Sequence, residues 1–169
     1  MPRFGAAVIE FQTVGRVAWS GRERNRMAIS VEELIFPTLE CIHIAGFIAA
    51  IGTTAIVDFR ILDLGFQSQT SAQLAKSTSM WMLGGLLVAI FTGIGIYSTD
   101  PDMYYHNWPF LIKNASLVIA IVFHYTVHRK VAQSGGASLG GKLAACISLL
   151  LWSSVIFGGI FIAFIAGGL

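Results

Sequence analysis

Charged residues are scarce in this chain. Of its 169 residues only 12% are Asp, Glu, Lys or Arg, whereas 55% are hydrophobic. Soluble domains carry about 25% charged residues, so the composition excludes an ordinary soluble domain and indicates a membrane protein. A chain of this length that forms one membrane bundle has no room for a separate soluble domain.

Few cysteines and a small net charge exclude further classes. Cys41 and Cys146 both lie in apolar segments, where they are expected to pack as small side chains and to form neither a disulfide framework nor a metal site. The net charge of +2 and the lack of a basic cluster exclude a nucleic acid as partner. The first residues also lack the charged start, apolar core and cleavage pattern of a signal peptide.

Four apolar segments have about the length that a membrane-crossing helix needs, which is roughly 20 residues. We therefore predict an all-α fold, a bundle of four transmembrane helices over residues 30–169, with spans at about 34–59, 80–97, 108–127 and 143–166. Residues 1–29 are amphipathic and are expected to lie at the membrane interface. Gly85, Ala89 and Gly93 recur at intervals of four, which predicts close helix packing.

The basic residues give the orientation only when short loops are weighted more than the N-terminal tail. The first and third loops are then expected inside, and the loop over Asp100–Asn107 outside. Asp58 and Arg60, at the end of the first helix, are expected to form a local ion pair at the interface.

The ionisable residues of the apolar segments are the most informative feature, because such groups are costly in hydrocarbon and usually serve a function there. His43 lies in the first segment, and Lys113, His124 and His128 lie in the third, which His106 precedes. The first and third helices run in the same direction. His43, Lys113 and His106 are therefore expected in one half of the membrane, and His124 and His128 in the other.

These residues favour a haem-binding protein. A haem iron between helices needs two axial ligands at similar depth, with space for the flat ring. Gly46 and Ala50 follow His43 on one helix face and predict such space. We predict that haem b is bound and that the chain transfers electrons, either beside other membrane redox subunits or as a homo-oligomer. The candidate iron ligands are His43 and His124, and the further candidate cofactor-binding residues are Lys113, His106 and His128.

Other interpretations of the same residues stay open. The polar residues around His43 are alternatively a network that only fixes helix packing, in a structural or accessory subunit without a cofactor. His124 and His128 are spaced to chelate a zinc or copper ion, although His-x-x-x-His alone is a weak signal, and a buried histidine next to an interfacial one is the plainer interpretation. Glu40 and His43 have the spacing of a carboxylate di-iron site, but the other helices carry no glutamate.

Several ordered stretches resemble an uncharacterised family of bacterial four-helix membrane proteins, from about residue 30 to the end. This resemblance implies a multi-pass protein of the bacterial inner membrane and carries no activity. The stretches are Leu34–His43, Val57–Leu62 and Phe110–Lys113, followed by Phe123, His124 and Arg129.

The chain is more distantly similar to the HemJ-type protoporphyrinogen oxidases and the CopD-like copper-resistance membrane proteins. In the HemJ type an early histidine precedes a later helix with a lysine, a histidine pair and an arginine. That similarity implies a haem-dependent oxidase in which His43 binds the iron and Lys113 is essential. Leu111 stands where those proteins have a histidine, which weakens the implied oxidase activity more than the implied haem.

Overall fold

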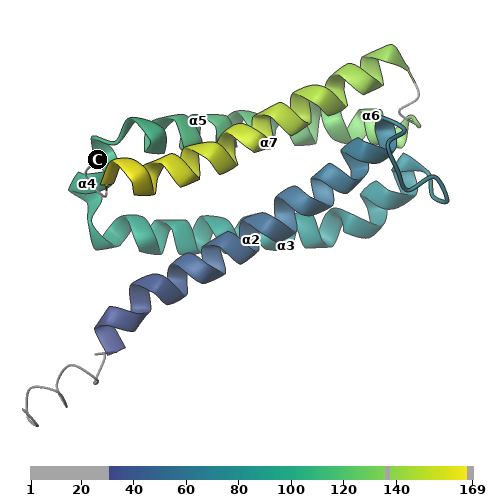
Figure 1. The fold of residues 1–169 in the computed structure, drawn as a ribbon. Coiled ribbons are helices and arrows are strands. Elements are labelled where there is room, and N and C mark those ends of the chain that lie inside the picture. The colour runs from purple at the N-terminus through teal and green to yellow at the C-terminus, as the bar shows by residue number, and fades with distance from the viewer. Residues whose placement is uncertain (1–30, 136–137, 167–169) are drawn as a thin grey trace, which may run out of the picture. The chain divides into compact units, whose positions relative to one another are not determined.

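The structure is a computed structural model that describes residues 31–135 and 138–166. The described residues form helices joined by short connections, without a strand (Figure 1). The predicted interfacial segment, residues 1–29, lies outside the described residues. The elements are α2 (Val31–Ile61), α3 (Ser71–Thr99), α4 (Pro101–Tyr105), α5 (Trp108–Phe123), the π-helical turn η1 (His124–His128), α6 (Arg129–Gln133) and α7 (Leu139–Ala166).

Four helical stretches are long and apolar enough to cross a membrane, which confirms the predicted all-α, four-helix fold. They are Leu34–Ile61, Ser71–Thr99, Trp108–Gln133 and Leu139–Ile162. The shortest has 24 residues and is therefore about 36 Å long at 1.5 Å per residue, more than the roughly 30 Å of hydrocarbon in a bilayer.

Three of the four long helices begin before their predicted apolar segments and three end after them, whereas the third begins at Trp108 and the fourth ends at Ala166 as predicted. The second helix starts at Ser71 rather than near Met80, because Thr70 and Gln73 form a capping box. The Thr70 hydroxyl accepts a hydrogen bond from the Gln73 amide, and the Gln73 side chain accepts one from the Thr70 amide. Such a box satisfies two amides that a helix start leaves without partners. Polar capping therefore sets this boundary, and hydropathy does not.

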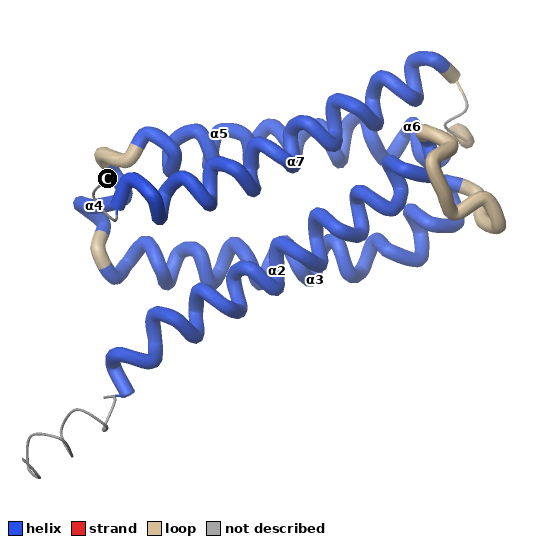
Figure 2. Tube along the Cα trace, viewed as in Figure 1, coloured by secondary structure: helices blue, strands red, loops and turns tan. Residues whose placement is uncertain are grey.

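The chain divides into two compact units, residues 1–38 and residues 39–169. In the first, the described residues form the beginning of α2, where the Thr38 hydroxyl donates to the Leu34 carbonyl at 2.7 Å. All contacts described below lie within the second unit. There the long helices alternate in direction along the chain, so that α5 runs parallel to α2, and α7 packs along α5 (Figure 2).

The interior of the second unit is built largely from small side chains. One buried cluster draws on all four long helices, and a second lies toward α6. Trp81, Phe91 and Leu150 are instead 69%, 69% and 70% exposed, which is the distribution expected where lipid surrounds the bundle. The first cluster contains Ala50, Met82, Leu86, Ala120, Trp152 and Val155, and the second contains Val57, Ile61, Leu74, Ala132 and Ala145.

Helices α2 and α3 cross with their backbones in contact. A Cβ atom on Gly85 would lie 2.6 Å from the Gly46 carbonyl oxygen and 2.8 Å from the Ala50 nitrogen. A Cβ atom on Gly46 would lie 2.8 Å from the nitrogen of Ala89. Side chains larger than hydrogen do not fit at these two positions. The predicted role of small residues in helix packing is thus confirmed, and its partners are now assigned.

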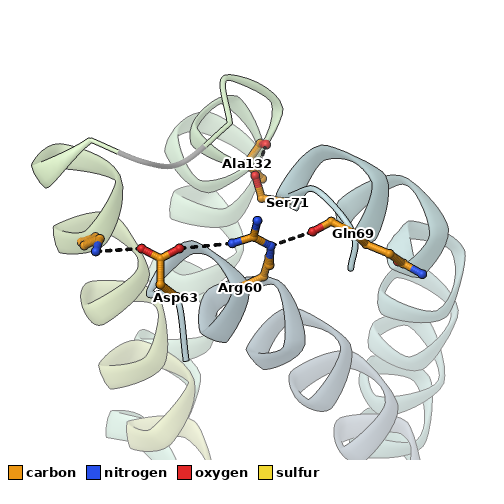
Figure 3. Close-up of polar contacts among 6 residues, drawn as sticks. Arg60, Asp63, Gln69, Ser71 and Ala132 are labelled. Carbon is orange, nitrogen blue, oxygen red and sulfur yellow. Dashed lines mark hydrogen bonds and ion pairs between the residues drawn. The ribbon is translucent and has the colours of Figure 1, made fainter. Parts of the chain in front are cut away.

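A polar network ties the connections together at the end of the bundle where α2 ends (Figure 3). Asp63 pairs with Arg60 at 3.2 Å and with Lys142 at 2.9 Å. The Arg60 Nε also donates to the Gln69 carbonyl at 2.6 Å. The hydrogen bond and charge of Lys142, with a smaller contribution from Arg60, lower the pKa of Asp63 below its usual value. The network therefore joins the first loop to the beginning of α7.

Candidate functional site

The first polar site of the bundle is a contact between His43 on α2 and Lys113 on α5. The His43 Nδ1 lies 2.7 Å from the Ala89 carbonyl and 3.2 Å from the Thr92 hydroxyl, and its Nε2 lies 3.1 Å from the Lys113 Nζ. Because a carbonyl can only accept, Nδ1 carries the hydrogen, and Nε2 offers its lone pair to the lysine. The contact confirms that His43 and Lys113 lie at the same depth.

Small residues and one aromatic ring enclose this pair closely. A Cβ atom on Gly93 would lie 2.9 Å from the His43 Cε1, and one on Gly158 would lie 2.9 Å from the Lys113 Cβ. The Lys113 Nζ lies 5.1 Å from the centre of the Phe47 ring, a cation–π distance. Glu40, on the same helix as His43, is exposed. Among the described residues no carboxylate pairs with Lys113. Its ammonium group instead contacts the His43 imidazole and the Phe47 ring.

This arrangement does not fit a haem at His43. Iron would bind Nε2, which the Lys113 amine already contacts. The face that carries Gly46 and Ala50 is filled by α3, whose Gly85 backbone approaches it within van der Waals distance. A haem here would have to displace Lys113 and separate α2 from α3. The haem prediction itself stays a prediction.

The second polar site lies near the opposite end of the bundle. It joins Asp58 on α2 to His128 in η1 and to Ser148 on α7. The His128 Nε2 lies 2.7 Å from the Asp58 Oδ1, and the Ser148 hydroxyl lies 2.7 Å from Oδ2. Asp58 is 0% exposed and His128 and Ser148 are each 1% exposed. Both neighbours donate, because a carboxylate accepts only. The expected Asp58–Arg60 pair is wrong: Asp58 points into the bundle, whereas Arg60 turns to Asp63.

The two sites form matching cross-links between the parallel helices. Each links residues 70 positions apart, His43 with Lys113 and Asp58 with His128. The spacing from His43 to Asp58 equals that from Lys113 to His128, at 15 residues. The sites are therefore about 22 Å apart along the bundle. The first buried cluster of the core separates them, so the structure contains two polar sites with an apolar layer between.

The second site continues into a π-helical turn that begins at His124 and ends at His128. Single π turns in membrane and soluble helices are rare and occur often at functional sites. The rings of His124 and His128 stack, with centres 5.0 Å apart and planes at 24°. The Nδ1 atoms of both rings are buried without a hydrogen-bond partner among the described residues. Buried polar atoms without partners call for a ligand, water or ion.

A cavity of about 200 Å³ adjoins both histidines. It is smaller than the roughly 300–1,000 Å³ typical of sites for drug-sized ligands, so a haem at His124 does not fit it either. In the described residues no group of three or more His, Cys, Asp or Glu side chains is placed to hold a metal. The cavity is lined by Thr53, Thr54, Val57, Ala75, Thr78, Ser79, Met80, Met82, Leu83, His124, Tyr125, His128 and Arg129.

The structure thus sorts the residues that the sequence singles out. His43 and Lys113 meet, and His124 meets His128 in the other half. His106 belongs to neither site: it is exposed at the end of α4, where its Nδ1 lies 3.3 Å from the Asp102 carbonyl.

The sequence analysis did not identify Ser148 or Asp58 as residues of the second site. Ser148 gives no signal in a sequence, since a serine within an apolar helix most often bonds its own backbone. Asp58 does give one, as a carboxylate inside an apolar segment.

Comparison with known proteins identifies the family. The chain belongs to a family of unknown function, DUF6644, whose model matches residues 34–165. This confirms the resemblance to an uncharacterised family. No curated protein and no solved structure matches the chain, and nothing supports the more distant similarity to HemJ-type or CopD-like proteins.

Proposed function

We propose that this chain is a membrane protein that binds a transition-metal ion between His124 and His128. The observation that carries the proposal is the state of His128: its Nε2 is held by Asp58, whereas its Nδ1 is buried and without a partner beside a cavity. Histidines that bind metals almost always donate their other ring nitrogen to a carboxylate or carbonyl, which fixes the tautomer and strengthens the ligand. His128 is oriented in this way.

His124 supplies the second nitrogen. Two histidines four residues apart on one helical face are a common chelating pair. Nitrogens that share one ion lie at most about 4 Å apart, given metal–nitrogen distances of about 2.0–2.1 Å. The ring centres are 5.0 Å apart, so the rings have to tilt toward each other. His124 can do so, because its Nδ1 has no partner to lose among the described residues.

The charges around the site suit a cation. Asp58 lies behind His128 and provides a negative charge that offsets the ion. Arg129 lines the cavity but is exposed, and its guanidinium lies 5.6 Å from the centre of the Tyr125 ring. Its positive charge opposes that of the ion, so the Asp58 carboxylate has to offset both. Without an ion or a water in the cavity, the Nδ1 atoms would stay buried and unpaired, at a cost of about 1–3 kcal/mol each.

Metal retention by the purified protein tests the proposal. Protein in detergent is equilibrated separately with Zn(II) and with Cu(I) and passed through a desalting column. The retained metal is then measured by inductively coupled plasma mass spectrometry. We expect one ion per chain for at least one metal, and loss of that ion in His128→Ala. His43→Ala is the matched control, because it also severs a cross-link between α2 and the third membrane helix. No retained metal, or equal retention in His128→Ala, would refute the proposal.

A further inference from the structure

We infer that the ion is Cu(I) and that the thioether of Met82 completes its coordination. This inference rests on the proposed metal site and specifies which ion the site takes. It follows from the number of ligands, from their chemical softness and from the burial of the site.

The number of ligands argues against a conventional zinc site. Structural zinc is bound by four nitrogen, sulfur or oxygen ligands in a tetrahedron, and catalytic zinc by three plus water. The described residues contain no cluster of three His, Cys, Asp or Glu side chains. Of these four residue types, the site therefore offers only the two imidazoles of His124 and His128 as ligands among the described residues. Cu(I), with a filled d shell, is stable with two or three ligands and needs no fourth.

The third ligand that we propose is a soft thioether sulfur. Thioether sulfur favours Cu(I), whereas imidazole serves zinc and copper alike. Met80 and Met82 line the cavity together with the two histidines. Met82 is 3% exposed and belongs to the buried core, whereas Met80 is 77% exposed. Met82 is therefore the inner ligand, and Met80 lies at the outer side of the cavity.

Burial fits the same ion. His128 is 1% exposed, and the hydroxyls of Thr54 and Thr78 in the cavity wall donate to carbonyls of their own helices, to Ala50 and Leu74. The hydrogens of these two hydroxyls therefore bond to the backbone and do not point at the ion. A monovalent ion loses less hydration on entering such a place than a divalent one. The carboxylate of Asp58 behind His128 balances a single positive charge.

Competition with a chromophoric Cu(I) chelator tests the inference in the full-length protein. We expect 1:1 binding of Cu(I), tighter than that of Zn(II), and X-ray absorption with two nitrogen ligands and one sulfur ligand. Met82→Leu keeps the volume of the side chain and removes the sulfur. Its Cu(I) affinity should fall at least about tenfold, since even changes outside the ligand set cost about 10–100-fold. Met80→Leu is the control and should change the affinity less.

The outcomes separate the two proposals. A site that retains Zn(II) through His128 but prefers it to Cu(I) would overturn the copper inference and leave the metal-binding function standing. Unchanged Cu(I) affinity in Met82→Leu, with no sulfur in the absorption spectrum, would also overturn it. A protein that retains neither ion refutes both.

Discussion

Replacement of Gly85 by alanine should loosen the bundle at the crossing of α2 and α3. The added Cβ atom would lie 2.6 Å from the Gly46 carbonyl oxygen and 2.8 Å from the Ala50 nitrogen. Both are backbone atoms, which cannot rotate away. Ordinary contact begins near 3.4 Å, so the helices must separate by about 0.8 Å at this point. Gly84→Ala is the matched control, because nothing lies within 4 Å of the Cβ atom that it adds.

Overpacking of this kind typically costs about 1–3 kcal/mol. For a chain of this size, that corresponds to a fall of about 2–12 °C in the midpoint of thermal unfolding. Melts of the purified protein in detergent, followed by circular dichroism, measure it.

The control decides how the result is interpreted. Gly84→Ala should melt at the same temperature as the wild type or slightly above, because alanine favours helix more than glycine does. If Gly85→Ala melts with Gly84→Ala, the close crossing does not exist in solution. The core arrangement built on it would then have to be abandoned.

Three further predictions concern pH, haem and topology. Asp63→Asn deletes the charge and keeps a residue that tolerates the left-handed backbone of this position (φ 61°). Because the pKa of Asp63 is lowered in the folded state, the wild type should be more stable than the variant above about pH 4 and should lose this advantage as the pH falls through the folded-state pKa. A difference in melting temperature that stays constant from about pH 6 to about pH 3 would contradict this prediction. Since Lys113 occupies the His43 Nε2, the visible spectrum should contain no Soret band that depends on His43, and a band lost in His43→Ala would restore the haem prediction. Asp102→Cys, in a chain without its native cysteines, should react with an impermeant thiol reagent on whole cells; reaction only after permeabilisation would reverse the predicted orientation.

Hydropathy and helix direction were enough to predict how far along the bundle each residue lies. Apolar length predicts the four helices, and counting residues along parallel helices predicts which groups share a depth. His43 meets Lys113, as that counting implies. Depth along a helix follows from 1.5 Å per residue and needs no tertiary information.

Rotation about the helix axis was the information that the sequence did not supply. Gly46 and Ala50 read equally well as room for a ring and as the seat of another helix, and the backbone contact with Gly85 decides for the second. Asp58 was assigned to a neighbour two residues away because local partners are the ones that a sequence displays. Its true partners lie 70 and 90 positions ahead. The π turn at His124–His128 was likewise not predicted from the sequence.

The two cross-links also constrain the order of assembly. The partners of His43 and Asp58 follow them by 70 residues, and Ser148 follows Asp58 by 90. At about 5–20 residues synthesised per second, α2 waits about 4–14 s for the first of them. Until then the Asp58 carboxylate lacks both of its partners, which is costly in a membrane, whereas His43 already finds Ala89 on α3. We therefore expect the first helix to pack stably only once the third membrane helix has been made, and the loss of His128 to delay that packing.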